Sequence, residues 1–523
     1  MPSRELVALA SRGMFPREVP PCFSSASLGL FLDLNCENIS GFLDSNSVKS
    51  SDFGVHNLAR VGKLRRKVAV VNPIHFLKLS DCIVQNWKEV ECLCSGGHLS
   101  VTTPKISYLN SNRAIEPKKS FSERPPIKIK KRYGVRFVLK ADILRFYPSI
   151  YTHSIEWAVV GKPEAKSNLD KSNAADERNL GQKLDRLSRC MQDRQTTGIP
   201  IGPDTSLVIA EILLASVDRD LRCKIGSLRG TRAIDDYELY FREKHEAEDA
   251  LTVLQETLSK YNLDLNQSKT KILKLPCPVE STWPYRLKNF DFREGKLQKN
   301  DIITYFDIAF ELSKKYEKES ILKYAISRIS RDNNIKISTH AWTTYQNLLL
   351  QCAVGEPGTQ KYVLSELKKY KYHSLNRDKI QHTLESIISH HAPLGHGSEV
   401  VWALWIAIDL EIELPSHLRT ILDIDDPLVP ILALYAEERG LISNLDTSTL
   451  ERIVDIENLY GENWLLSYES RIRGWLGLNP HGSFSNGCSR FQRMKKGSVR
   501  FLREPEDLDR EETTSAAIGG YYH

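Results

Sequence analysis

Two adjacent aspartates between apolar segments constrain the fold of this chain more than any other feature. Residues 231–241 are expected to form a strand, a tight turn that carries Asp235 and Asp236, and a second strand. Adjacent carboxylates in an apolar hairpin repel each other unless a cation neutralises them. The segment therefore predicts a hairpin with a cation site at its turn, and a solvated acidic turn is the alternative that this segment alone leaves open.

Two other segments carry chemistry that fits this hairpin. Residues 140–151 (KADILRFYPSIY) are expected to include a strand that ends at Asp142, and residues 198–206 (GIPIGPDTS) to form a Gly/Pro turn before a helix over residues 206–221. Mg²⁺ prefers oxygen ligands and usually keeps waters and substrate phosphates in its shell. Asp142 and the Asp235–Asp236 pair can hold two such ions, which would activate a 3′-hydroxyl and stabilise the leaving pyrophosphate.

A basic segment precedes Asp142. Between residues 118 and 140, nine basic residues accompany a single acid, Glu123; the nine are Lys118, Lys119, Arg124, Lys128, Lys130, Lys131, Arg132, Arg136 and Lys140. The apolar residues between them suit a hairpin that leads into a buried strand. A solvated basic face is the simplest interpretation, but the position just before the acidic motif favours contact with a polyanion.

The length and the apolar pattern indicate several domains. A chain of 523 residues exceeds one ordinary hydrophobic core, so two or three domains are expected. After about residue 300, stripes of helical spacing recur at roughly 20-residue intervals, which is typical of stacked helices such as an α-solenoid. The expected division is an N-terminal segment without an assigned role (1–64), a mixed domain (65–295), an α-helical repeat-like domain (296–480) and a flexible charged tail (481–523).

The composition excludes several classes of protein. The formal net charge is +6, and the longest apolar run, Val400–Ile408, has nine residues, which is far short of a membrane span. The N-terminus lacks the apolar core of a secretory signal. Ten cysteines show no Cys-x-x-Cys spacing, so reduced thiols are expected rather than zinc fingers or disulfides. We therefore expect a soluble cytoplasmic protein without a membrane partner.

Over roughly residues 65 to 290 the chain resembles a palm-type reverse transcriptase. Asp142 matches the first metal-binding motif, residues 198–206 the Pro-x-Gly motif beside template and nucleotide, and Asp235–Asp236 the paired aspartates. The segments FYPSIYTHSIEW and GIPIGPDTS look like those of bacterial defence-associated, abortive-infection-type reverse transcriptases. The resemblance implies an α+β, right-hand-like polymerase with fingers and palm, followed by an all-α helical-repeat domain. It also implies RNA-directed DNA polymerase activity in antiphage defence.

The resemblance implies a role for each motif residue. Asp142 and Asp235 would bridge two Mg²⁺ ions (Mn²⁺ is also suitable), with Asp236 nearby and the Ile143 carbonyl as a further ligand. The Tyr147 ring would pack under the sugar, and Lys269 would neutralise or protonate the departing pyrophosphate. The remaining candidates for binding template, nucleotide, triphosphate or nucleic-acid backbone are Gly198, Pro200, Gly202, Arg124, Lys128, Lys130 and Arg132.

The motifs also depart from the general polymerase pattern. Ala233 stands where an aromatic residue is usual, and Ile201 where glutamine is usual, as in the defence group, which is similar to enzymes that make DNA without an ordinary template or primer. The partners implied are an RNA template or noncoding RNA, a DNA product, deoxynucleotides and further copies of the chain in a homo-oligomer. Two alternatives are a nucleic-acid-binding scaffold with an inactive palm, and a group-II-intron-type maturase polymerase, which would need a Cys/His-spaced tail that the sequence lacks.

Two minor features leave alternatives open. His390, His391 and His396 are expected to lie in a loop as solvated histidines, with metal binding as the other interpretation. Tyr521 and Tyr522 are interpreted as ordinary tail tyrosines, with protein-primed DNA synthesis from one of their hydroxyls as the alternative.

Overall fold

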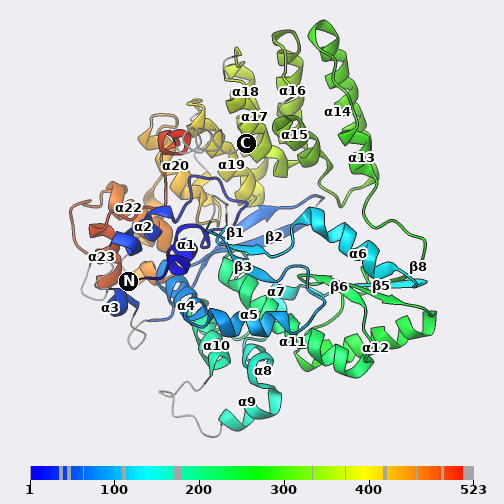
Figure 1. Cartoon of the computed structure of the whole chain (residues 1–523). Coiled ribbons are helices and arrows are strands. Elements are labelled where there is room, and N and C mark those ends of the chain that lie inside the picture. Colours follow the sequence, from blue (N-terminus) through cyan, green and yellow to red (C-terminus); the bar gives the residue numbers. More distant parts are fainter. Residues whose placement is uncertain are drawn as a thin grey trace.

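A four-stranded antiparallel sheet holds the acidic residues (Figure 1). Its strand order is β6-β7-β5-β8, and the strands are β6 (Gly230–Ala233), β7 (Asp236–Phe241), β5 (Phe137–Asp142) and β8 (Lys271–Lys274). The β6–β7 hairpin that the sequence predicts is confirmed, with the turn between Ala233 and Asp236. This computed structural model describes residues 2–34, 39–43, 49–62, 64–108, 113–169, 179–332, 334–371, 373–415, 421–454, 457–484 and 488–510.

Helices pack on one face of this sheet. The helix predicted after the Gly/Pro turn is α11 (Asp204–Ile225), which is buried along most of its length, and α12 (Lys244–Lys260) packs on β5, β7 and β8. Short helices and strands complete this half of the chain: α4 (Pro73–Gln85), α5 (Trp87–Ser95), β3 (Pro104–Ile106), β4 (Ile115–Pro117), α7 (Phe146–Ser149), α8 (Ser154–Val160), α9 (Lys162–Leu169) and α10 (Leu180–Cys190). The region therefore mixes helices and strands, as expected.

The basic segment is a helix, and the expected hairpin is wrong. A 3-10 turn over Phe121–Glu123 leads into α6 (Arg124–Arg132). Ser120 and Glu123 form a reciprocal capping box, and prolines occupy the first turn of α6, where a missing backbone N–H costs nothing. The start signals of a helix thus outweigh the alternation of basic and apolar residues that suggested a hairpin.

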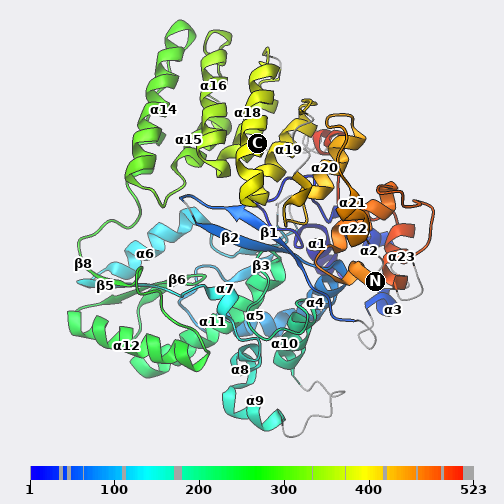
Figure 2. The ribbon, with the colours of Figure 1, turned by 180° about the vertical axis from the view of Figure 1, so that it is seen from behind.

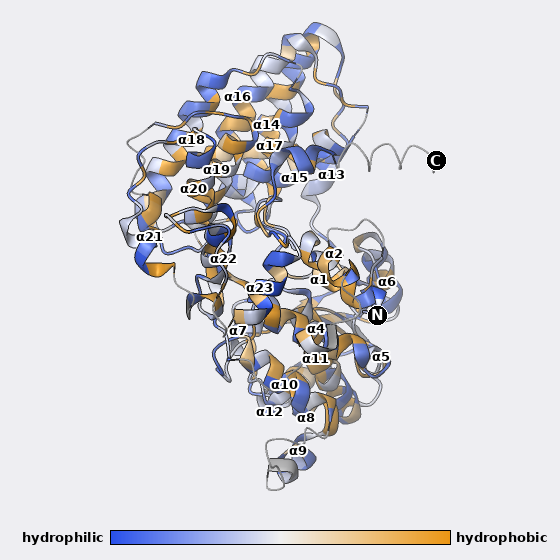
Figure 3. Ribbon diagram, turned by 90° about the vertical axis from the view of Figure 1, so that its left-hand side faces the viewer, coloured by the Kyte–Doolittle hydropathy of each residue, from blue (hydrophilic) through white to orange (hydrophobic). Residues whose placement is uncertain are grey.

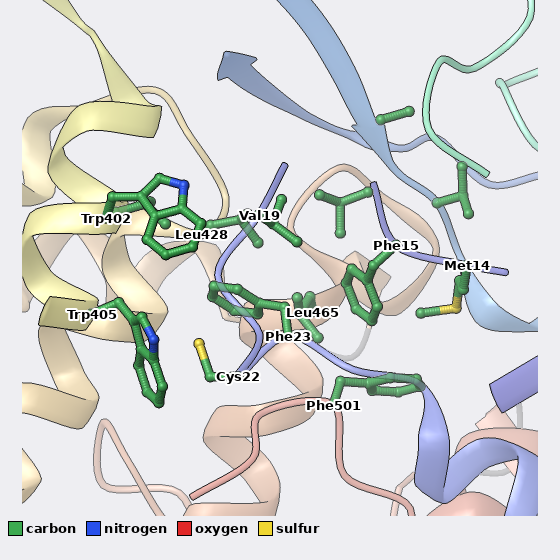
Figure 4. Packing of buried hydrophobic residues seen from close by; sticks show 14 of the residues in the cluster. Met14, Phe15, Val19, Cys22, Phe23, Trp402, Trp405, Leu428, Leu465 and Phe501 are labelled. Carbon is green, nitrogen blue, oxygen red and sulfur yellow. The ribbon is translucent and has the colours of Figure 1, made fainter. Parts of the chain in front are cut away.

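The N-terminal residues belong to the folded body of the protein. Strand β1 (Gly54–Ala59) pairs with β2 (Arg65–Val70), so this hairpin crosses residue 64. Helix α1 (Arg4–Arg12) packs on α2 (Ala26–Leu34) and on α4, and α3 (Ile39–Leu43) contacts α4 as well. Figure 4 shows Phe15, Val19 and Phe23 packed among Trp402, Leu428, Leu465 and Phe501 of the C-terminal half. The N-terminal segment therefore joins the two halves of the chain through a shared core.

The C-terminal half is helical, as the sequence predicts. Helices α14, α16 and α18 lie side by side in the two opposite views (Figures 1 and 2). The helices of this half carry both hydrophobic and hydrophilic residues (Figure 3). The helices are α13 (Trp283–Lys288), α14 (Gln298–Lys315), α15 (Ile321–Arg331), α16 (Thr339–Gly355), α17 (Gln360–Lys369), α18 (Arg377–His391), α19 (Gly397–Asp409), α20 (Val429–Glu438), α21 (Ser448–Ile453), α22 (Trp464–Arg473) and α23 (Ser489–Lys496). Their repeat-like character stays a prediction.

Two expectations for this half need correction. The tail from residue 481 is not flexible over residues 488–510, because α23 and the segment after it bury Phe491, Met494 and Phe501 in the core. His390 and His391 end α18 rather than lying in a loop. Tyr521 and Tyr522 lie outside the described residues. Among the described helices, none is long and apolar enough to cross a membrane.

Candidate active site

Strand pairing brings the three acids together. Asp142 ends β5 and Asp236 begins β7, and the two are direct Cα partners in the antiparallel register, while Asp235 lies in the adjoining turn. Burial and the neighbouring carboxylate charges raise the pKa of Asp235 and raise the pKa of Asp236 to about 6. This concentration of negative charge disfavours full ionisation until a cation compensates it.

A lysine and an asparagine hold Asp142. Lys269 Nζ lies 2.7 Å from Asp142 Oδ2, and Asn266 Nδ2 donates to Oδ1 at 3.0 Å. Both residues belong to the turn before β8. The Asn266 backbone N–H also donates to the Asp142 carbonyl at 2.7 Å. Lys269 therefore neutralises part of the acidic charge directly.

The turn that presents Asp235 is strained and held from both sides. Ile234 has a φ of 56°, which is a rare conformation for a β-branched residue and costs about 1–3 kcal/mol. Its N–H donates to Thr102 Oγ1 at 3.0 Å, and its carbonyl accepts from Arg232 NH1 at 2.9 Å. These two bonds hold the peptide units on both sides of Ile234, so they position the backbone that carries Asp235.

Arg232 is the centre of a buried ionic network under the turn. Its side chain is fully buried, with NH2 2.9 Å from Glu211 Oε1 and 2.9 Å from Asp218 Oδ2, both on α11. Tyr237 donates its hydroxyl to Asp218 Oδ1 at 2.9 Å. The nearby Asp218 and Glu211 charges hold the pKa of Arg232 well above its usual value despite burial, so the guanidinium stays charged. The network ties the hairpin to the helix behind the sheet.

The Gly/Pro turn lies against the segment that follows Asp142. Gly198 N donates to the Ile150 carbonyl at 2.7 Å, and Ile199 N donates to the Tyr147 carbonyl at 3.0 Å. Gly198 has a φ of 84°, and a Cβ there would lie 3.2 Å from the Pro148 carbonyl oxygen, so glycine is required. Burial and the Asp235 charge raise the pKa of Tyr147, whose ring contacts Phe146 with centroids 5.3 Å apart.

Residues from far upstream support the same turn. Gly202 has a φ of 132°, and a Cβ on it would meet Pro16 at 2.6 Å. Asp204 forms an ion pair with Arg113 and accepts from the Ala114 and Ile115 N–H groups at 2.9 Å each. Pro200 is buried within the turn. The turn is therefore fixed in place on several sides.

Of the four basic residues predicted to bind triphosphate or nucleic-acid backbone, Lys128 and Arg132 form ion pairs with Glu238. Glu238 of β7 lies 2.9 Å from Lys128 Nζ and 3.0 Å from Arg132 NH2, with Lys140 Nζ at 3.3 Å. Lys130 is exposed, and the Arg124 guanidinium lies 4.0 Å from the ring centroid of Phe121, which is itself 79% exposed. The structure thus uses Lys128 and Arg132 to dock α6 on the sheet and leaves Lys130 facing solvent.

The Glu238 cluster predicts a specific pH dependence. Burial favours the neutral acid, but the Lys128 hydrogen bond and the charges of Lys128, Lys140 and Arg132 prevail and lower the pKa of Glu238 to about 2. A depressed folded-state pKa adds stability above the unfolded-state value near 4.5, and this stability is lost as the pH falls toward 2. Glu238→Gln should therefore lower the melting temperature most at pH 7. Thermal melts from pH 7 to 3 should show the difference from wild type shrinking below about pH 4.5, whereas a constant difference would contradict the electrostatic role.

Several site residues were missed by the sequence analysis. Arg232, Glu211 and Asp218 form the buried network, Asn266 binds Asp142, and Arg66 of β2 is close enough for its charge to act on Asp235. One signal was present, because Glu211 and Asp218 are two turns apart on the apolar face of α11, where buried acids need a cationic partner. Asn266 and Arg66 carry no comparable local pattern.

The donor set fits a divalent cation. Asp142, Asp235 and Asp236 supply oxygen ligands, and the raised pKa values of the last two show that Lys269 alone does not balance their charge. The bridge between Ile143 and Leu265 uses the Asp142 carbonyl and the Leu144 N–H, so it leaves the Ile143 carbonyl out. These groups can bind a metal ion together with the phosphates of a nucleotide.

Comparison with known proteins identifies this region. Residues 98–325 match the family described as "Reverse transcriptase (RNA-dependent DNA polymerase)", and this match includes all three aspartates. Solved structures that are similar include apo telomerase from Candida tropicalis, with 11% identity, a TM-score of 0.34 and coverage of 69% of each chain. Another is telomerase from Candida albicans with a fragment of telomeric RNA, with 12% identity, a TM-score of 0.30 and coverage of 72% of this chain and 70% of that one. No curated protein matches the chain. The chain therefore contains a reverse transcriptase domain and is an RNA-directed DNA polymerase, a nucleotidyltransferase.

Proposed function

We propose that this polymerase makes DNA by two-metal nucleotidyl transfer, either RNA-templated or untemplated, in antiphage defence. The observation that carries the mechanism is the convergence of Asp142, Asp235 and Asp236 at the ends of two paired strands. Two Mg²⁺ ions (or Mn²⁺) bound there would activate the 3′-hydroxyl and stabilise the leaving pyrophosphate. The protein's own contribution is to hold these carboxylates in fixed positions on a rigid sheet.

Residues around the acids have separate tasks in this proposal. Lys269, 59% exposed and paired with Asp142, is placed to turn toward the pyrophosphate once metal charge replaces its own. The turn that contains Gly198, Pro200 and Gly202 supports the place where template and nucleotide lie. Lys130 and Arg124, which α6 presents, serve the triphosphate or the nucleic-acid backbone.

The narrower assignment to defence rests on the motifs. Ala233 and Ile201 replace an aromatic residue and a glutamine in the manner of abortive-infection-type enzymes. We propose that deoxynucleotides, an RNA template or noncoding RNA, and a homo-oligomer of the chain belong to the working system in the bacterial cytoplasm. A tyrosine hydroxyl is one candidate primer.

Nucleotide incorporation by the purified full chain tests the proposal. Labelled deoxynucleotides with Mg²⁺, with and without added RNA, should yield DNA, and sequencing of copurifying nucleic acid should reveal the template or the product. Cells that carry the gene should resist phage, and substitution of Asp235 should remove the resistance. Absence of synthesis together with tight nucleic-acid binding would instead indicate a scaffold with an inactive site.

Tyr147 should select the sugar. Tyr147 is close enough to Asp235 for that charge to raise its pKa. If its ring packs under the sugar of the bound nucleotide, as we propose, a ribose hydroxyl would clash or displace the reacting atoms. Tyr147→Ala should raise ribonucleotide use relative to deoxynucleotide use by about ten- to a hundred-fold. Competition between the two nucleotide types measures this ratio.

Phe146→Ala is the matched control for the sugar test. Phe146 is buried at 2% exposure, so its truncation should mainly destabilise the fold, by about 3–5 kcal/mol, without changing the sugar preference. An unchanged preference in Tyr147→Ala would show that selectivity lies elsewhere.

A further inference from the structure

Two histidines and a glutamate meet where α18 turns into α19. His391 is the last residue of α18, His396 directly precedes α19, and Glu399 lies in the first turn of α19. His391 Nδ1 and His396 Nδ1 are 3.0 Å apart, and they lie 3.7 and 3.8 Å from Glu399 Oε1. Three potential ligand atoms from three side chains thus lie within 3.8 Å of one another.

These separations suit one small transition-metal ion. Zn–N and Zn–O bonds are about 2.0–2.1 Å long, so ligand atoms of a tetrahedral site are about 3.3 Å apart. The measured values of 3.0, 3.7 and 3.8 Å bracket this length. Burial lowers the pKa of His391 and of His396, which favours the neutral imidazoles that donate a lone pair to a metal.

Hydrogen bonds from Arg65 and Ser398 hold the Glu399 carboxylate in place. Its side chain is 1% exposed, and Arg65 of β2 binds it through NH1 to Oε1 at 2.6 Å and NH2 to Oε2 at 2.7 Å. Ser398 donates to Oε2 at 2.7 Å, and the Ala59 N–H donates to the Ser398 hydroxyl at 2.8 Å. A carboxylate oxygen accepts more than one partner, so Oε1 retains a lone pair for an ion. Hydrogen bonds of this kind orient metal-binding carboxylates.

The cluster opens into a cavity lined by both polar and apolar residues. The cavity has a volume of about 540 Å³, and its lining includes Arg60, Arg65, His390, His391, His396 and Glu399. His391 and His396 side chains are 13% and 25% exposed, so an ion can reach them from this side. The space also accommodates a water molecule as a fourth ligand.

We propose that His391, His396 and Glu399 form a Zn²⁺ site, separate from the acidic site of the polymerase. Two imidazoles with one carboxylate suit Zn²⁺, whereas Mg²⁺ prefers oxygen ligands alone. The ion would link the end of α18 to the start of α19 and, through Arg65, to the β1–β2 hairpin. That hairpin also carries Arg60, on which the charges of Asp142 and Asp235 act.

Zinc binding by the full-length chain tests this site. After treatment with a chelator and dialysis, titration with ZnCl₂ followed by gel filtration and elemental analysis should give one bound equivalent. His391→Ala and His396→Ala should each weaken binding at least tenfold. His390→Ala is the matched control, because His390 lines the same cavity but contributes no ligand atom to the cluster, and it should bind zinc as the wild type does.

Co²⁺ absorption gives a second measurement. It is made on the wild type alone, so it is independent of any folding difference between wild type and variants. Co²⁺ bound to the wild type should show the visible absorption of a four-coordinate site, and ZnCl₂ should abolish that absorption. A wild type that retains no zinc would overturn the proposal and leave a hydrogen bond between the two imidazoles as the explanation of the 3.0 Å contact. Zinc binding that persists in both histidine variants would overturn it equally.

Discussion

Asp142→Ala and Asp235→Ala should each reduce nucleotide incorporation by at least about a thousand-fold. Each change removes a ligand from the metal site, where developing charge on the reacting oxygens needs full compensation. The fold should survive, because removal of one carboxylate relieves the repulsion that raises the pKa of Asp236 to about 6. Incorporation of labelled deoxynucleotide by purified protein, together with a thermal melt in chelator, measures both effects.

Asp249→Ala is the matched control for this result. Asp249 lies on the exposed side of α12 in the same domain, so its substitution makes the same change in charge away from the site. It should incorporate nucleotide at the wild-type rate. A wild-type rate in Asp142→Ala or Asp235→Ala would refute the assignment of the metal ligands.

Arg232→Met should destabilise the protein by about 3–5 kcal/mol at pH 7. The substitution leaves Glu211 and Asp218 buried without their cation and removes the hydrogen bond to the Ile234 carbonyl. With the arginine absent, the folded protein must bury two charges or protonate them, and protonation costs nothing once the pH falls below the unfolded-state pKa near 4. The destabilisation should therefore shrink from pH 7 to pH 4.5.

Chemical denaturation of wild type and variant at the two pH values tests this expectation. Arg222→Met on the exposed side of α11 is the control, and it should change stability by no more than about 0.5 kcal/mol. A conservative Arg232→Lys variant that keeps stability but loses activity would separate the positioning of Asp235 from the stability of the fold. Equal loss of stability for Arg232→Met at pH 4.5 and 7 would contradict the ionic account.

Much of the fold could be predicted because its signals are local. The β6–β7 hairpin follows from apolar segments around two acids, and α11, α14 and α16 follow from apolar stripes of helical spacing. The basic segment forms a helix rather than a hairpin because Ser120, Glu123 and the two prolines of α6 provide helix-start signals that outweigh the alternation of basic and apolar residues. Helix-capping residues therefore predict the local structure better than the alternation of basic and apolar residues when the two signals disagree.

The motif residues of the candidate site can be recognised in the sequence, but the residues that hold the acids in position cannot. Asp142, Asp235 and Asp236 carry motif signals, but their placement depends on Thr102 and Asn266, which are more than 100 residues away from them or their turn in sequence. The N-terminal segment could not be assigned for the same reason, since its packing partners lie hundreds of residues away in sequence. Residues that are distant in sequence but in contact in the fold produce no periodic pattern in the sequence.

The pairing of the two ends of the fold sets an order of assembly during synthesis. Ser24 N donates to the Phe501 carbonyl at 2.9 Å, and Arg503 N donates to the Cys22 carbonyl at 2.8 Å, while Pro16 of the same N-terminal segment packs on Gly202. These two hydrogen bonds cannot form until residue 503 has been synthesised, tens of seconds after residue 24 at elongation rates of about 5–20 residues per second. A nascent chain can thus complete the sheet early, but the N-terminal segment that packs on the turn beside the acids gains its two hydrogen bonds to the C-terminal segment only near the end of translation.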